Sequence, residues 1–107
     1  METIKSRSEF ERVFTCGKRL SDRLLRVRVA RLEDGAAPGK VAFVAPKRLG
    51  NAVFRNRCKR VLREAARQWG LPREGVDVIL MATKDTHDSH PDEVAASLGK
   101  LMRRAGL

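Results

Sequence analysis

The hydrophobic pattern of the chain begins with a helical segment. Phe10 and Phe14 lie one turn apart in a stretch whose apolar positions recur at helical spacing. Ser8 and Glu11 have the S-x-x-E spacing of a capping box, in which a hydroxyl and a carboxylate satisfy free backbone amides at a helix start. We therefore predict a first helix that starts near Ser8 and ends at Gly17.

Strand patterns follow this helix. Residues 23–32 alternate, so that leucine and valine side chains face one way while Arg26 and Arg28 face the other. Residues 18–21 are predicted to form a short partner strand before this segment, and residues 33–39 have the composition of a loop. The pattern predicts a strand with one apolar face and one positive face.

Two further apolar segments also have strand character. Residues 40–46 predict a second long strand, and Pro46 should lie at its end because proline cannot donate a ladder hydrogen bond. Residues 76–82 are short and almost continuously apolar. That composition is expected of a strand buried on both faces.

The longest helical pattern begins after Gly50. Asn51 can cap a helix that runs to about Trp69, because Gly70 and Pro72 then terminate it. On a helical wheel the apolar residues gather on one side, which we predict to be the core face: Phe54, Cys58, Val61, Leu62, Ala65 and Trp69.

A last helix is predicted to begin near Pro91, after a polar loop over residues 84–93. The element order, α-β-β-β-α-β-α, indicates an α/β (α+β) two-layer sandwich. At 107 residues the chain is expected to form one domain over 1–107, with residues 1–7 as a flexible basic lead-in. The apolar stripe of the last helix comprises Val94, Leu98, Leu101 and Met102.

The net charge of +10 is distributed unevenly along the chain. Residues 1–70 contain 18 Lys and Arg against 7 Asp and Glu, whereas residues 71–107 contain 5 against 6. This asymmetry indicates a polyanionic partner for the first two-thirds of the chain. The predicted helices have no large apolar face beyond what a core needs, so a nucleic acid is favoured over a membrane surface.

The long helix concentrates this charge. Arg55, Lys59, Arg63 and Arg67 form an i, i+4 series, in which each neighbouring pair of like charges costs about 0.2–0.5 kcal/mol. Glu64 is the only carboxylate on this helix, whereas a solvated helix face usually mixes both signs. The pattern therefore favours contacts to phosphates, which arginine binds in bidentate geometry. Two further cations precede the helix: Lys47 and Arg48.

Other sequence features indicate the cellular compartment of the protein and the redox state of its cysteines. No stretch approaches the roughly 18 consecutive apolar residues of a membrane span, and the N-terminus lacks the apolar run of a secretory signal. We therefore expect a cytoplasmic protein. Cys16 and Cys58 have no zinc-ligand spacing, and we expect both to be reduced, small core residues.

Candidates for catalysis by protein side chains are confined to one loop. His87 and His90 lie among Asp85, Asp88 and Asp92. This loop could bind a metal weakly, or the two histidines could act as acid and base, but a solvated loop is the favoured interpretation. The basic two-thirds of the chain has no carboxylate cluster of the kind that holds Mg²⁺ in nucleases. We expect no catalytic residue and no metal or cofactor bound by the protein.

One segment has the character of a family signature. Residues 47–65, KRLGNAVFRNRCKRVLREA, closely resemble the signature of the protein subunit of bacterial ribonuclease P, including its Arg-Asn-Arg core. Residues 8–19 resemble the first helix and turn of that family, and residues 75–82 resemble its last strand. The resemblance covers nearly the whole chain in the right order.

The resemblance implies a protein that assists a catalytic RNA in removing the 5′ leader from precursor tRNA. The RNA would carry the active site and its Mg²⁺ ions, and the partners would be this RNA and precursor tRNA, with no DNA and no membrane. The basic helix would form a left-handed crossover between two parallel strands, against the usual right-handed preference. The surface that docks on the RNA subunit would comprise Asn51, Arg55, Asn56, Arg57, Lys59, Arg60, Arg63 and Arg67. A cleft for the single-stranded leader would comprise Phe10, Phe14, Arg28, Lys47 and Arg48.

Some alternatives stay open at the level of sequence. Phe10 and Phe14 could be ordinary core residues. Arg28 stands where the family often has an aromatic residue, and Pro46 replaces a residue that is usually small and polar. A structural RNA-binding protein of the small ribosomal-protein type would share the charge and the fold class. A protein-only nuclease would require the loop that contains His87.

Overall fold

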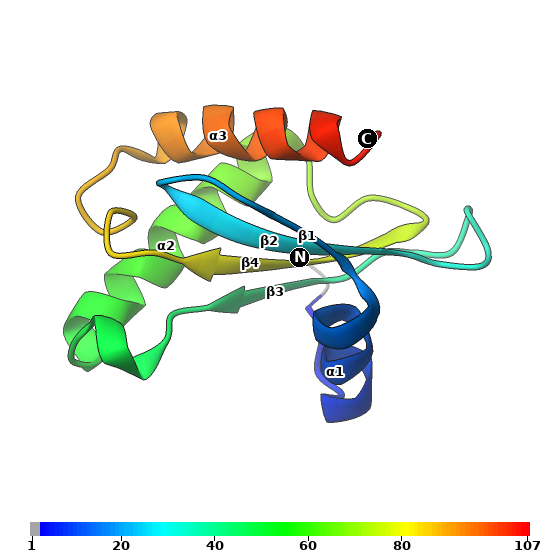
Figure 1. The fold of residues 1–107 in the computed structure, drawn as a ribbon, viewed down its shortest axis with the longest axis horizontal. Helices are drawn as coiled ribbons and strands as arrows, with labels where there is room; N and C mark the ends of the chain where they lie inside the picture. The colour runs from blue at the N-terminus through cyan, green and yellow to red at the C-terminus, as the bar shows by residue number, and fades with distance from the viewer. Residues whose placement is uncertain (1–2) are drawn as a thin grey trace.

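The computed structural model of the chain describes residues 3–107, and its element order confirms the predicted one (Figure 1). Helices α2 and α3 cover one face of a four-stranded sheet, which is the predicted two-layer arrangement, and α1 packs against part of the other face (Figure 1). The elements are α1 (Arg7–Cys16), β1 (Lys18–Ser21), β2 (Leu25–Arg31), β3 (Val41–Val44), the 3₁₀ turn η1 (Lys47–Leu49), α2 (Ala52–Trp69), β4 (Val76–Ala82) and α3 (Pro91–Arg104).

The strands lie in the order β1-β2-β4-β3. The β1–β2 and β2–β4 pairs are antiparallel, whereas β3 and β4 are parallel. Because α2 connects these two parallel neighbours, the basic helix is the crossover between them. In the β1–β2 ladder Arg19 lies opposite Arg28, and Ser21 lies opposite Arg26.

The two faces of the sheet have separate hydrophobic clusters. Strand β4 contributes to both, as predicted for a strand buried on both faces, with Leu80 on one side and Ile79 on the other. The cluster under α1 is small: Val13 packs with Ala30, Ala42 and Ile79. The larger cluster, between the sheet and helices α2 and α3, includes the fully buried Leu25, Val27, Leu62, Val78, Leu80, Val94, Leu98, Leu101 and Met102.

The predicted start of α1 is wrong by two residues. Ser6, not Ser8, is the N-cap: its backbone is extended, and its hydroxyl accepts a hydrogen bond from the Glu9 amide at 3.4 Å. The same S-x-x-E spacing occurs at Ser6 and Glu9, so the motif alone did not decide between two overlapping candidates. Glu11 instead pairs with Arg7 on the exposed face of the helix. The predicted end is confirmed, because Gly17 is the C-cap.

The end of α1 requires a glycine. A Cβ atom on Gly17 would lie 2.3 Å from the Val13 carbonyl oxygen, which is closer than a carbon atom can approach. The helix therefore passes directly into β1 after its last turn. Since α1 covers only part of the sheet, Val13 is its one buried residue, and Cys16 is exposed rather than in the core as predicted. Cys58 is buried as expected, and both cysteines are free thiols.

An ion pair fixes α1 to the sheet. Asp77 of β4 is buried, and its Oδ2 accepts a hydrogen bond from Arg12 Nη2 at 2.6 Å. The other oxygen, Oδ1, accepts from the Lys40 amide at 2.9 Å. A second pair joins Lys40 Nζ to Glu9 at 3.3 Å. These contacts set the position of α1 over the strands, where the small cluster gives limited packing.

The N-terminal lead-in and strand β3 are both shorter than the sequence predicted. Residues 1 and 2 of the predicted lead-in lie outside the described residues, and Arg7 already belongs to α1. Thr3 forms a parallel bridge with Val41, and the Ile4 amide donates to the Val41 carbonyl at 2.8 Å. The predicted strand over 40–46 is reduced to the four residues of β3, because the chain turns into η1 after Pro46.

Candidate nucleic-acid interface

Helix α2 begins and ends at the two capping residues that the sequence predicts. Asn51 Oδ1 accepts a hydrogen bond from the Phe54 amide at 2.9 Å, and Gly70 ends the helix in the left-handed conformation. Cys58 and Leu62 are fully buried on the core face, while Trp69 packs at the margin of the core. The side chain of Asn51, assigned above to RNA binding, therefore has a capping role. Burial of one face leaves the cations on the rest of the helix surface.

Two arginines near the start of α2 are tied to neighbouring backbone. Arg55 Nε donates to the Ala45 carbonyl at 2.9 Å, and Arg57 Nε donates to the His87 carbonyl at 3.1 Å. The ring of Phe54 stacks on His87 with centroids 4.0 Å apart, which strengthens the second connection. The first turns of α2 are thus held between the β3–α2 connection and the β4–α3 loop.

The other predicted docking residues have few contacts within the protein. Arg67 pairs with Glu64 at 2.7 Å, and it is the only cation of α2 with a carboxylate partner among residues 3–107. The guanidinium of Arg63 lies 5.1 Å from the centroid of the Phe43 ring. No hydrogen bond or ion pair within the described residues engages the remaining side chains: Asn56, Lys59 and Arg60. The like charges on α2 are therefore left largely uncompensated, as the sequence indicated.

A second basic surface lies on the face of the sheet that α1 covers in part. The rings of Phe10 and Phe14 are stacked with centroids 5.9 Å apart. Phe10 is partly buried and packs against the small cluster, whereas Phe14 is 39% exposed. Phe10 therefore fits the interpretation as a core residue. Phe14 presents its ring to solvent, as a residue that lines a binding surface would.

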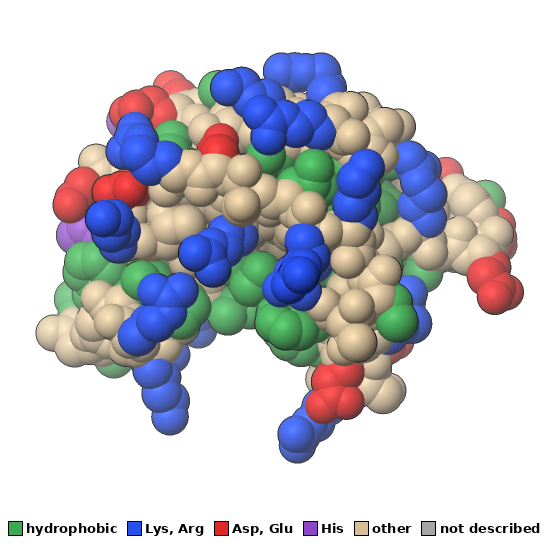
Figure 2. Space-filling model, viewed as in Figure 1, with side chains coloured by type: hydrophobic (Ala, Val, Ile, Leu, Met, Phe, Trp, Pro, Cys, Tyr) green, Lys and Arg blue, Asp and Glu red, His purple; other side chains and the backbone are tan. Residues whose placement is uncertain are grey.

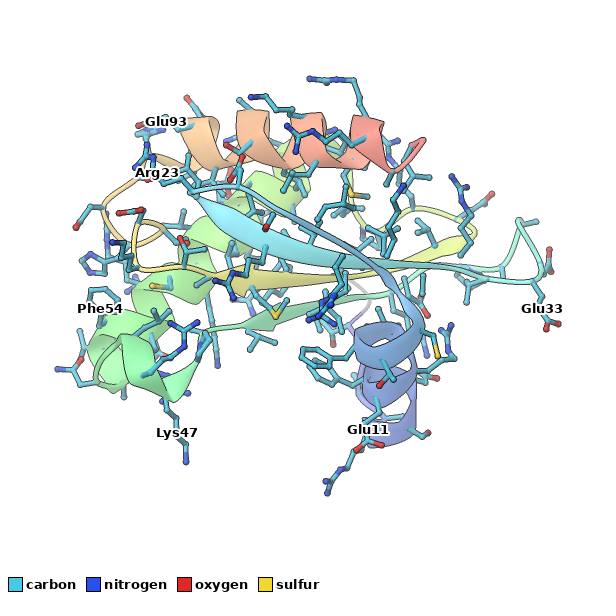
Figure 3. All side chains as sticks on the ribbon, viewed as in Figure 1. Glu11, Arg23, Glu33, Lys47, Phe54 and Glu93 are labelled. Carbon is cyan, nitrogen blue, oxygen red and sulfur yellow. The ribbon has the colours of Figure 1, made fainter. Side chains whose placement is uncertain are left out.

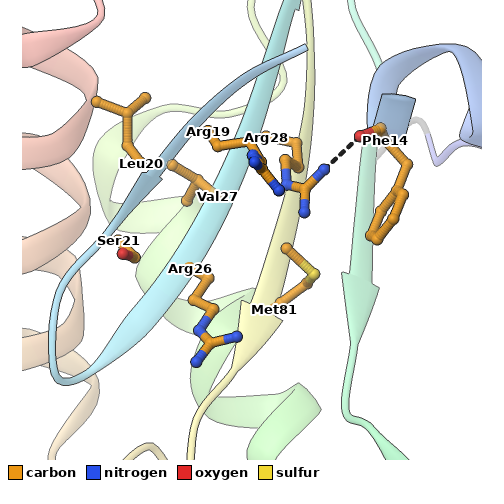
Figure 4. Close-up of a pocket in the computed structure, with 8 residues that line it drawn as sticks. All are labelled: Phe14, Arg19, Leu20, Ser21, Arg26, Val27, Arg28 and Met81. Atoms are coloured by element: carbon orange, nitrogen blue, oxygen red, sulfur yellow. Dashed lines mark hydrogen bonds between the residues drawn. The ribbon is translucent and has the colours of Figure 1, made fainter. Parts of the chain in front are cut away.

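Arg28 adjoins this aromatic pair. Its guanidinium carbon lies 4.1 Å from the centroid of the Phe14 ring, and its Nη1 donates a hydrogen bond to the Phe14 carbonyl (Figure 4). Burial, and then the charges of Arg19 and Arg26, lower the pKa of the Arg28 guanidinium below its ordinary value. Three arginines held together on adjacent strands repel one another, which favours an anionic or acceptor-rich ligand at this place.

The arginines and Phe14 line a hollow of about 320 Å³, named here the Phe14 hollow (Figure 4). Sequence reasoning did not assign Arg19, Arg26 or Met81 to the site. Arg26 could have been predicted, because the alternation of β2 places it on the same face as Arg28. Arg19 required the β1–β2 register, which a four-residue strand does not reveal. The complete lining comprises Phe14, Arg19, Leu20, Ser21, Arg26, Val27, Arg28 and Met81.

A second hollow of about 360 Å³, named here the Arg48 hollow, shares Ser21 and Arg26 with the first. Its lining also contains two carboxylates, Asp22 and Asp85, and Asp85 pairs with Arg23 at 3.8 Å. The cations outnumber them and come from three parts of the chain: Arg23, Arg26, Arg48 and Lys84. The structure thus links Phe14 and Arg28 to Arg48 through two adjoining hollows in which cations outnumber carboxylates. Lys47 lies outside both linings and extends away from the body of the protein (Figure 3). Figure 2 shows hydrophobic side chains flanked by Lys and Arg on this side of the molecule.

The loop that contains His87 and His90, for which the sequence favoured a solvated loop over a catalytic or metal site, has structural roles. His90 caps α3, because its Nδ1 accepts a hydrogen bond from the Asp92 amide at 3.1 Å. His87 stacks on Phe54, and its Nδ1 lies 2.7 Å from Asp88 Oδ1. Within residues 3–107, no three His, Cys, Asp or Glu side chains come together in a way that could hold a metal ion. None of the helices in this range is long and apolar enough to cross a membrane.

Comparison with known proteins connects this chain to one family. A family model described as Ribonuclease P matches residues 1–106. The ribonuclease P protein component of Symbiobacterium thermophilum is 37% identical over 105 residues, covering 97% of this chain and 90% of that protein. The corresponding protein of Clostridium novyi is 32% identical over 107 residues, covering 99% and 95%.

Solved structures of bacterial RNase P proteins have the same fold. The protein from Staphylococcus aureus superposes with a TM-score of 0.78 at 25% identity, covering 98% of this chain and 95% of that one. The protein from Thermotoga maritima gives a TM-score of 0.77 at 25% identity, covering 97% of each chain. Both sequence and fold therefore agree over almost the entire length.

Proposed function

This chain belongs to the family of ribonuclease P proteins. We propose that one of its two basic surfaces binds the RNA subunit of the enzyme and that the other binds the leader of the substrate. The protein is the RNA-binding component of ribonuclease P, the ribonucleoprotein that removes the 5′ leader from precursor tRNA. Its partners are the ribonuclease P RNA and precursor tRNA. This family assignment favours the ribonuclease P role over a structural protein of the ribosomal type.

The cationic face of α2 docks on the RNA subunit. The observation that carries this assignment is the series of cations without carboxylate partners, of which Arg60 is the clearest example within the described residues. Counter-charge from RNA phosphates would relieve the repulsion between neighbouring cations on the helix. The hydrogen bonds of Arg55 and Arg57 to backbone carbonyls hold the start of this face in place.

The Phe14 hollow and the Arg48 hollow hold the single-stranded leader. Proteins bind single-stranded RNA with cationic grooves and with aromatic or guanidinium planes on which bases stack. Phe14 and Arg28 supply such planes, while Arg26 and Arg48 extend the positive charge along the sheet. Catalysis, with its Mg²⁺ ions, is assigned to the RNA partner, and the complex to the cytoplasm.

Assembly tests the docking surface. Binding of the purified protein to ribonuclease P RNA should weaken in Arg60→Ala, and the slope of log affinity against log salt should decrease by about one, because one phosphate contact is lost. Thermal melting should stay near that of the wild type. Arg104→Ala, which removes an exposed charge from α3, is the matched control and should leave the slope unchanged. Equal effects of the two substitutions would exclude a specific role for α2.

Substrate binding tests the leader surface. In the reconstituted holoenzyme at low Mg²⁺, Phe14→Ala should weaken binding of leader-bearing precursor tRNA by about five- to 150-fold, since stacking on one aromatic ring contributes about 1–3 kcal/mol per base. Binding of mature tRNA, which has no leader, should change little. Equal losses for both RNAs would remove Phe14 from the leader surface.

A further inference from the structure

The two arginines of the Arg-Asn-Arg motif are held in the same way at the start of α2. Arg55 donates from Nε to the Ala45 carbonyl, and Arg57 donates from Nε to the His87 carbonyl. No hydrogen bond or ion pair among residues 3–107 engages their terminal amino groups, Nη1 and Nη2. Two parallel N–H donors are what arginine uses to bind a phosphate in bidentate geometry. Each side chain is therefore fixed at Nε, and its outer end is left for a ligand.

The carbonyl that accepts from Arg57 belongs to a loop that is anchored independently of α2. On one side of His87, the fully buried Thr86 donates from its hydroxyl to the Leu24 carbonyl at 2.6 Å. On the other side, the buried Ser89 hydroxyl donates to a backbone carbonyl of the same loop at 2.7 Å. Since the loop is fixed, the orientation of Arg57 depends on how closely α2 is held against it.

A stack of two rings holds the helix against this loop. Phe54 lies in the first turn of α2 (Figure 3), and its ring and the His87 ring are parallel to within 3°, with centroids 4.0 Å apart. The Phe54 ring also lies close to the Gly50 backbone, where a Cβ atom would be 3.1 Å from its Cγ. The Asp88 carboxylate, 2.7 Å from His87 Nδ1, fixes the orientation of the imidazole. The His87 residue thus meets α2 twice, through its ring and through its carbonyl.

We propose that His87 is a positioning residue of the RNA-docking surface. Its ring, stacked on Phe54, holds α2 against the β4–α3 loop, so that the outer end of Arg57 is oriented toward an RNA phosphate before the RNA binds. Ordering a long side chain only on binding would weaken the complex by about two- to twelvefold. The stack avoids this loss. The inference rests on the proposed docking function of α2.

The test measures binding of each purified variant to ribonuclease P RNA over a range of salt concentrations. His87→Ala removes the ring and should weaken binding by about two- to twelvefold. The slope of log affinity against log salt should stay that of the wild type, because Arg57 still reaches its phosphate. Arg57→Ala should instead make the slope less steep by about one. His87→Phe keeps a flat ring on Phe54 and should restore most of the affinity.

The other histidine of the loop supplies the matched control. His90 caps α3 and forms no hydrogen bond, ion pair or ring stack with α2 among residues 3–107. His90→Ala should therefore lower the melting temperature and leave the RNA affinity unchanged. A double-mutant cycle identifies the side chain through which His87 acts. The loss caused by His87→Ala should disappear in an Arg57→Ala background and persist in an Arg60→Ala background.

Two results with His87→Ala would overturn the proposal: an affinity equal to that of the wild type, or a loss of the same size with and without Arg57. A loss that His87→Phe does not restore would also overturn it, since the stack would then not be responsible. Melting curves establish that each variant is folded at the temperature of the assay. The docking function of α2 fails separately, if Arg57→Ala and Arg60→Ala both bind the RNA as tightly as the wild type.

Discussion

The ion pair between Arg12 and Asp77 should determine how firmly α1 is held on the sheet. Replacing Arg12 with methionine keeps most of the apolar stem and removes the charge. A charged hydrogen bond contributes about 1.5–3 kcal/mol, and partial exposure of Arg12, 42% for its side chain, reduces this to about 1.5–2 kcal/mol. Asp77 keeps the Lys40 amide as a hydrogen-bond donor to Oδ1, which reduces the larger penalty of an unpartnered buried charge.

Chemical denaturation of Arg12→Met should therefore show a loss of about 1.5–2 kcal/mol in the free energy of unfolding, and the melting temperature should fall by roughly 6–12 °C. Arg7→Met is the control, because the Arg7–Glu11 pair on the same helix is exposed and should contribute less than about 0.5 kcal/mol. If both variants lose the same amount, the Arg12–Asp77 pair does not anchor α1.

The same substitution has a functional readout. Since α1 carries Phe14, loosening the helix should reduce the preference of the holoenzyme for leader-bearing over mature tRNA. Binding to ribonuclease P RNA through α2, on the opposite side of the sheet, should be nearly unaffected. A destabilised variant with an unchanged leader preference would show that the leader surface tolerates movement of α1.

Three further predictions concern single positions. Gly17→Ala should cost at least about 1 kcal/mol of stability because its Cβ would clash with a carbonyl, whereas Gly35→Ala, with open space around the new Cβ, should stabilise slightly; paired denaturation curves measure both. Cys16 should react with a thiol reagent in the native protein and Cys58 only after unfolding, since Cys58 is buried and burial raises its pKa, which reduces the thiolate fraction. Asn51→Ala should lose about 1 kcal/mol while Asn51→Ser retains most of the cap; equal RNA affinity in Asn51→Ser and the wild type would assign the residue to capping alone.

The sequence predicted most accurately those elements whose signals are local. The apolar run of β4 coincides with residues 76–82 as observed, and α2 begins and ends at its predicted caps. The start of α1 was mispredicted because Ser6 and Ser8 both satisfy the same short motif. Tertiary packing, which decides between them, is absent from the local pattern.

The arrangement of the candidate site residues was predictable where one element carries them, and less so where several elements meet. The cations of α2 follow from helical periodicity alone. The Phe14 hollow instead combines α1, β1, β2 and β4, and its missed members depend on strand register. The Arg12–Asp77 pair joins residues 65 positions apart, and no spacing rule connects them.

The sheet itself has a mechanical consequence for the enzyme. Helix α2 packs on one face and α1 on the other, and β4 contributes Leu80 and Ile79 to the two sides of the same strand (Figure 1). In the proposed complex, with the catalytic RNA on one surface and the leader on the other, the sheet would set the distance between two RNA molecules. Substitutions inside β4 would then alter the alignment of the substrate with the RNA active site, even where both affinities are retained.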